Sequence, residues 1–122
     1  MLQDINNQED VKLLVDSFYD LVNKDELLSP IFNHIAQVNW TLHVEKMYKF
    51  WGTMLLGEMS YKGSAYNVHE KMPLSKIHFE RWLLLFEQTV DLHFEGDKAE
   101  DAKKTARTIG ITFQAKMGLL TK

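Results

Sequence analysis

The chain has 122 residues, of which 45% are hydrophobic and 25% charged, and a formal net charge of −3 at pH 7, so we expect one compact domain, 1–122, that binds no nucleic acid. Cysteine is absent, which excludes disulfides, thiolate catalysis and cysteine-bound metal clusters. The sequence has no apolar run of roughly 18 residues to span a membrane and no signal-peptide pattern, which favours a cytoplasmic protein.

The first predicted helix covers about residues 8–27. Asn7 and Asp10 at its start resemble a capping signal. Apolar residues at spacings of three and four give it one apolar face: Val11, Leu14, Val15, Phe18, Leu21 and Val22. Pro30 is expected to stop this helix, and "SPIF" at 29–32 is expected to form a short turn with Phe32 buried.

The second predicted helix runs from Trp40 to Leu56, where Gly57 provides a natural stop. Its stripe consists of His43, Met47, Phe50, Trp51 and Met54. The segment 61–75 follows, and it contains several turn formers, among them Gly63 and Pro73. We therefore expect a loop with at most one or two helical turns in this segment.

Ser75 starts a third predicted helix, which extends to about Phe94. Its stripe consists of Phe79, Trp82, Leu83, Phe86 and Val90. Asp97 with Glu100 predicts a capping box for the last helix. That helix carries apolar residues at near-regular spacing: Ala102, Ala106, Ile109, Phe113 and Met117. No segment alternates like a strand, so the fold class is all-α, with four main helices.

Motifs of common enzyme classes are missing from the sequence. There is no H-E-x-x-H or E-x-x-H, no Gly-rich phosphate loop and no G-x-S-x-G. Seven Phe, four Tyr, three Trp and six Met are present, and they can fill a core or line a cavity for a flat apolar ligand. Four residues allow both interpretations: Tyr19, His43, His69 and Trp82. Each of them alone is better explained by packing or by solvent exposure than by ligand binding.

Taken together, these residues resemble a truncated haemoglobin of group III over nearly the whole chain. The markers, in order, are "FYDLV" at 18–22, "SPIF" at 29–32, "W-x-x-H" at 40–43, "FWGTMLLGE" at 50–58, "YKG" at 61–63, the segment from His69 to Pro73, and "FERWLLLFE" at 79–87. The lack of a Gly-Gly pair also fits group III, because the other truncated groups typically carry such pairs. The resemblance implies a shortened globin fold in which two helix pairs cross over a haem, haem b.

The resemblance also implies a role for each matching residue. His69 is expected to be the metal ligand on the proximal side of the haem. Tyr19 and Trp82 are expected to be distal donors, with His43 as the distal histidine, which in this group can swing outward as a gate. The other expected contacts are Phe32, Met47, Phe50 and Trp51 around the distal face, Met72, Ile77 and Phe79 near the proximal side, and Ile109 and Phe113 at the cavity floor. The propionates need partners at the rim, for which the choices are Lys46, Lys71, Arg81 and Tyr61.

A phenol O–H and an indole N–H that donate to bound dioxygen are expected to slow its release. Slow release favours nitric oxide dioxygenation or peroxide activation over bulk oxygen transport. The expected small ligands are dioxygen, nitric oxide, carbon monoxide or peroxide, and an unidentified reductase is the expected partner. An alternative of another class stays open: a helical interaction or sensor domain that keeps the fold without haem.

Overall fold

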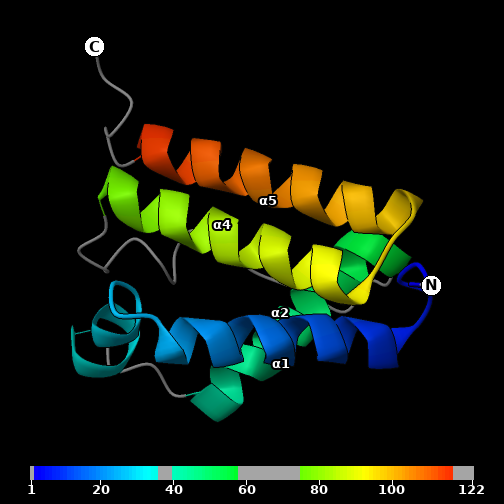
Figure 1. Ribbon diagram of the computed structural model, residues 1–122, viewed down its shortest axis with the longest axis horizontal. Helices are drawn as coiled ribbons and strands as arrows, with labels where there is room; N and C mark the ends of the chain where they lie inside the picture. The colour runs from blue at the N-terminus through cyan, green and yellow to red at the C-terminus, as the bar shows by residue number, and fades with distance from the viewer. Residues whose placement is uncertain (1, 36–39, 58–74, 117–122) are drawn as a thin grey trace.

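The computed structural model describes residues 2–35, 40–57 and 75–116 (Figure 1). The described residues form four long helices and one π-helical turn: α1 (Gln8–Lys24), η1 (Ile31–Ile35), α2 (Trp40–Leu56), α4 (Lys76–His93) and α5 (Asp97–Lys116). They contain no strand beyond an isolated bridge between Gln3 and Phe94. The all-α prediction is therefore confirmed.

The long helices form two pairs that pack on each other. In Figure 1, α4 and α5 run antiparallel in the upper part of the molecule, with α1 below α4 and α2 crossing behind. Contacts join α1 to α2 and α4 to α5 within the pairs, and α1 to α4 and α2 to α5 between them. This is the crossing of two helix pairs that the sequence led us to expect.

Most helix boundaries follow the sequence signals. The Asn7 side chain accepts a hydrogen bond from the Asp10 N–H at 2.9 Å, as a capping residue should. The bounds of α2 are those predicted, and Ser75 and Phe94 cap the two ends of α4. At "SPIF" the turn prediction is wrong, because the chain there enters η1; Phe32 is nonetheless buried, as predicted.

The first helix ends at Lys24, not near residue 27, because Asp25 holds the next turn. The Asp25 carboxylate accepts hydrogen bonds from the Leu27 and Leu28 N–H groups at 3.0 and 2.9 Å. Arg81 of α4 donates to the same carboxylate at 2.6 Å. Burial alone would raise the pKa of Asp25, but the hydrogen bonds from Leu28 and Arg81 outweigh it and lower the pKa. Asp25 thus ends α1 and ties it to α4.

Two predicted apolar stripes are narrower than expected. Leu21 of α1 and Met54 of α2 were assigned to buried faces, but their side chains are 37% and 53% exposed. Each lies at the edge of its helix's apolar face, where the neighbouring helix does not reach. Single exposed apolar residues are normal on a protein surface, so neither changes the fold.

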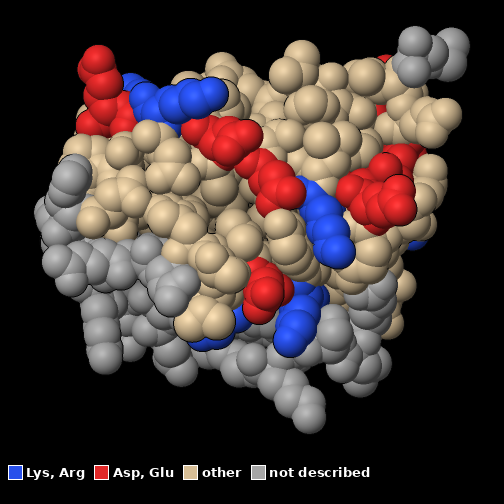
Figure 2. Space-filling view, turned by 90° about the horizontal axis from the view of Figure 1, so that it is seen from below, with Lys and Arg blue, Asp and Glu red and all other residues tan. Residues whose placement is uncertain are grey.

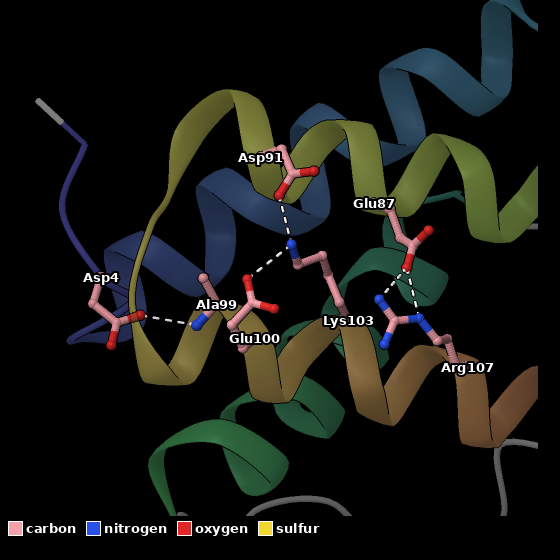
Figure 3. Close-up of polar contacts among 7 residues, drawn as sticks. All are labelled: Asp4, Glu87, Asp91, Ala99, Glu100, Lys103 and Arg107. Carbon is pink, nitrogen blue, oxygen red and sulfur yellow. Dashed lines mark hydrogen bonds and ion pairs between the residues drawn. The ribbon is translucent and has the colours of Figure 1, made fainter.

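The start of α5 is capped by a side chain far away in the sequence. The Asp4 carboxylate accepts hydrogen bonds from the Lys98 N–H at 3.0 Å and from the Ala99 N–H at 2.9 Å. Figure 3 shows the contact with Ala99. The prediction that Asp97 and Glu100 form the capping box is wrong, because Asp97 is already the first residue of the helix. The capping position before it is a glycine, which has no side chain, so the acceptor comes from the N-terminal segment.

That glycine, Gly96, also fixes how closely the N-terminal segment approaches. Its φ of +140° is rarely adopted by other residues, and a Cβ there would lie 2.6 Å from Cγ of Asp4. The neighbouring backbone is held as well, because the Glu95 N–H donates to the Gln3 carbonyl at 2.9 Å. The N-terminal segment therefore packs directly against the turn between α4 and α5.

Ion pairs join α4 and α5 on their outer side (Figure 3). Lys103 contacts Asp91 at 2.7 Å and Glu100 at 2.8 Å, while Arg107 contacts Glu87 at 2.7 Å. Exposed pairs of this kind contribute little to stability individually, so they mainly set the register of the two helices.

The surface carries charges of both signs. Figure 2 shows a face on which acidic and basic side chains lie in short mixed rows, separated by uncharged surface. The described part of this face has no broad basic area of the kind that binds nucleic acid. Within the described ranges, no helix is both long and apolar enough to cross a membrane.

We expect Asp4→Ala to lower the free energy of unfolding by about 1 kcal/mol near neutral pH, the usual cost of losing a capping acceptor. Partial burial alone would raise the pKa of Asp4, but hydrogen bonds, the one from Lys98 first, bring it below 3.8. The difference between wild type and variant should therefore be full above pH 3.8 and vanish as the pH falls through the lower folded-state pKa. Urea unfolding over this pH range measures it.

The matched control is Asp101→Ala, which removes an exposed carboxylate from the same helix. It should change the free energy of unfolding by less than about 0.5 kcal/mol. An equal loss in both variants would show that the effect of Asp4 comes from general electrostatics at the start of α5, not from capping.

Candidate functional site

An apolar cavity lies between the two helix pairs, and all four long helices contribute to its wall. The centre of a water molecule could occupy about 40 Å³ of it, more than the roughly 10–15 Å³ that one buried water requires. The predicted site residues that line it are Tyr19, Phe32, Met47, Phe50, Trp51, Phe79, Trp82, Ile109 and Phe113. The structure therefore brings together side chains that the sequence separates by up to 94 positions.

Four further residues line the cavity and were missed by the sequence analysis: Phe18, Leu28, His78 and Gly110. Helical spacing could have indicated two of them. His78 lies four residues before Trp82, on the same face of α4. Gly110 lies three residues before Phe113, on the same face of α5. Without the positions of Trp82 and Phe113, nothing in the local sequence marks His78 or Gly110 as a cavity residue.

The main polar contact near this cavity joins Tyr19 and His43. The Tyr19 hydroxyl lies 2.9 Å from Nε2 of His43, and the two side chains are only 5% and 4% exposed. Burial raises the pKa of Tyr19 far above its ordinary value, so the phenol keeps its proton. When His43 Nε2 accepts a hydrogen bond from the phenol, the phenol O–H points at His43 and is not available to a ligand. When an Nε2–H donates to the phenol oxygen, the phenol O–H is free to point into the cavity.

Aromatic rings hold this pair in place. The rings of Phe32 and Trp40 stack with centroids 5.7 Å apart, and the Tyr19 ring lies 5.4 Å from Trp40. The Trp40 indole N–H donates to the Asn33 side chain at 2.6 Å. Helix η1 and the start of α2 are thereby fixed around Tyr19, which leaves its hydroxyl little freedom to move.

Trp82 lines the cavity from α4. Its ring stacks on Phe86, with centroids 5.9 Å apart, and meets the edge of Phe18 at 5.7 Å. Phe86 in turn stacks on Trp51 at 4.8 Å. Among the described residues, the Trp82 indole N–H has no hydrogen-bond partner, so it can donate to a group in the cavity.

Gly110 leaves space on the α5 side of the cavity. It is buried, it lines the cavity, and a Cβ built on it would meet no atom within 4 Å. Glycine inside a helix costs about 1 kcal/mol relative to alanine, and here no neighbouring atom requires it. The open space in front of Gly110, walled by flat apolar side chains, fits a planar apolar group such as haem.

The other predicted site residues lie elsewhere. His43 contacts Tyr19 from behind the cavity wall. Lys46 is exposed, Ile77 is 58% exposed, and Arg81 is paired with Asp25; these three do not line the cavity. Outside the described residues lie His69, Met72, Tyr61 and Lys71. The described residues hold no group of three or more side chains that could chelate a metal ion by themselves.

Comparison with known proteins identifies the family. The family model described as "Bacterial-like globin" matches residues 1–114. The chain belongs to the bacterial-like globin family. It is 35% identical over 112 residues to the group 3 truncated hemoglobin ctb of Campylobacter jejuni, a match that covers 88% of each protein.

The solved structures agree with this assignment. The crystal structure of the group III truncated hemoglobin from Campylobacter jejuni matches with a TM-score of 0.84 and 33% identity, over 95% of this chain and 94% of that one. The group III truncated globin fold is therefore confirmed. Membership of a globin family implies haem binding and the binding of small gaseous ligands in general, and the apolar cavity of this globin suits both.

We expect Gly110→Ala to raise the free energy of unfolding of the haem-free globin by up to about 1 kcal/mol, because alanine favours the helix and its methyl group meets no atom. Gly57→Ala is the matched control. Gly57 has φ of +73° and also has open space around it, so alanine there should cost about 1 kcal/mol through backbone strain alone. Urea unfolding measures both; a loss of stability in Gly110→Ala would show that the space is not open.

Proposed function

We propose that this globin binds haem b with His69 as the proximal ligand and uses it to bind dioxygen and other small diatomic ligands. When bound, haem supplies the iron for ligand binding and for redox chemistry. The observation that carries the proposal is a globin-family cavity lined by both Tyr19 and Trp82, each able to donate a hydrogen bond. His69 is assigned by resemblance, and it lies outside the described residues.

The distal donors determine how long a ligand stays. Tyr19 keeps its phenol proton because burial raises its pKa, and Trp82 can only donate. A hydrogen bond to a negatively polarised ligand atom is worth about 1.5–3 kcal/mol, and each 1.4 kcal/mol changes a rate of release about tenfold. Slow release suits chemistry on the retained oxygen better than transport, which requires easy release.

We therefore propose redox chemistry on retained oxygen, either nitric oxide dioxygenation to nitrate or peroxide activation. Turnover would also require an external reductase. In this proposal His43 determines whether the Tyr19 O–H is available to the ligand. When Nε2 accepts a hydrogen bond from the hydroxyl, His43 competes with the ligand for it. When Nε2–H donates to the phenol oxygen, or when the imidazole swings outward, the hydroxyl can donate to the ligand. This is how a distal histidine would act as a gate.

The remaining residues have supporting roles in the proposal. The distal side of the haem would contact Phe32, Met47, Phe50 and Trp51, the proximal side Met72, Ile77 and Phe79, and the floor Ile109 and Phe113. Lys46 and Arg81 would lie near the rim. Support comes from the cavity lining for seven of these contacts, while Arg81 is already paired with Asp25.

We expect the protein to show a Soret band as isolated or after addition of haemin, and His69→Ala to abolish the histidine-ligated ferrous spectrum. His93→Ala, at the end of α4 and away from the cavity, is the matched control and should keep the wild-type spectrum. Absorption spectra of the ferric, ferrous and carbonmonoxy forms measure this. A colourless wild-type protein that takes up no haemin would contradict the proposal and favour a haem-free interaction domain.

We expect Tyr19→Phe and Trp82→Phe each to speed oxygen dissociation about tenfold, since each loses one donor and keeps its ring. Tyr48→Phe is the matched control, because the Tyr48 hydroxyl donates to Asp16 away from the cavity. Stopped-flow measurement of oxygen release tests this. Unchanged rates in both distal variants would remove the donor argument, and with it the case for redox chemistry over transport.

A further inference from the structure

His78 is the residue of the cavity wall with chemistry that the proposed function does not use. It lies in the first turn of α4, lines the cavity and is partly buried. Trp82 follows it four residues later on the same face, about 6 Å further along the helix axis. One face of α4 therefore directs two nitrogen-bearing rings toward the same space.

The start of α4 fixes which nitrogen of His78 carries the proton. Nδ1 of His78 lies 2.9 Å from the Ser75 backbone nitrogen and 2.9 Å from the Ser75 hydroxyl. A backbone N–H can only donate, so Nδ1 must accept and is unprotonated. The proton of the neutral imidazole is therefore on Nε2. Among the described residues, this Nε2–H has no partner.

The surroundings of His78 favour an anionic partner. The positive end of the α4 helix dipole is at this turn, which contains no acidic residue and carries Lys76. The described cationic side chains expected near the rim do not line the cavity, because Arg81 is paired with Asp25 and Lys46 is exposed elsewhere on α2. Of the remaining wall donors, Tyr19 is bonded to His43, and Trp82 packs on the ring of Phe86.

We propose that His78 binds a carboxylate of the porphyrin, a haem propionate, through Nε2–H, with the Ser75 cap holding the imidazole in the donor tautomer. This inference rests on the proposed function, because it requires haem in the cavity. It assigns His78 a double role: Nδ1 caps α4 and Nε2 holds the anionic edge of the cofactor. The same contact fixes which edge of the haem faces the start of α4.

Two substitutions test the donor role of Nε2 separately from the cap role of Nδ1. His78→Asn places an amide oxygen near the position of Nδ1, so it keeps the cap acceptor and loses the Nε2 donor. His78→Gln reaches further and carries both an amide oxygen and N–H donors; glutamine at this position is an ordinary capping-box partner of the serine, so this variant can keep both the cap and the donor. The probes are haemin and haemin dimethyl ester, whose esters remove the anionic carboxylates. Transfer of each porphyrin to an excess of apomyoglobin measures its rate of loss, and thermal unfolding of the haem-free variants measures the cap.

We expect His78→Asn to release haemin about tenfold faster than wild type, the effect of one hydrogen bond to a charged group. The dimethyl ester should leave both proteins at the same rate. His78→Gln should release haemin at close to the wild-type rate, and both haem-free variants should unfold at close to the wild-type temperature, because both keep the cap acceptor.

Equal haemin loss from wild type and His78→Asn would overturn the inference and leave the proposed function intact. The same acceleration for haemin and its ester would also overturn it, because it would show that His78 acts only through the structure of α4. A wild-type protein that takes up neither porphyrin would overturn the inference and the proposed function together.

Discussion

The hydrogen bond between Tyr19 and His43 is the constraint on which the distal part of the structure depends. Both side chains are buried among apolar rings, where a polar group without a partner costs about 1–3 kcal/mol. Each satisfies the other, so α1 and α2 can pack here only with these residues opposite each other. The stacked rings of Phe32 and Trp40 then complete the enclosure.

The α4 side of the cavity is built differently. Helix α4 has no reciprocal pair there; its Trp82 indole and His78 imidazole face the cavity without a described partner for either N–H. The ion pair between Asp25 and Arg81 holds α4 against the end of α1, and so sets the distance between the α1 and α4 sides of the cavity. The polar groups of Tyr19 and His43 bond each other, whereas α4 offers two N–H donors to the cavity. A planar group with a polar edge therefore has a preferred orientation in this cavity.

The sequence predicted the helices well and the connections less well. Gly57 and Ser75 mark real helix boundaries because their signals are local, whereas the Asp25 carboxylate that ends α1 is also held by Arg81, 56 residues away. The family resemblance identified most of the cavity lining, since those side chains match short motifs. It missed His78 and Gly110, which share a helix face with Trp82 and Phe113 but match none of the short motifs. His69, the residue that most needs a structural test, lies outside the described residues.

The Asp4 cap has a consequence for how the chain assembles. The first turn of α5 obtains its hydrogen-bond acceptor from a residue 94 positions earlier. That turn is therefore completed only when the N-terminal segment packs against the start of α5. Contacts of such long sequence separation form late in folding, because the intervening chain must first be ordered. The amide protons of Lys98 and Ala99 therefore exchange with solvent whenever the N-terminal segment detaches. They act as built-in reporters of local opening at this end of the helix.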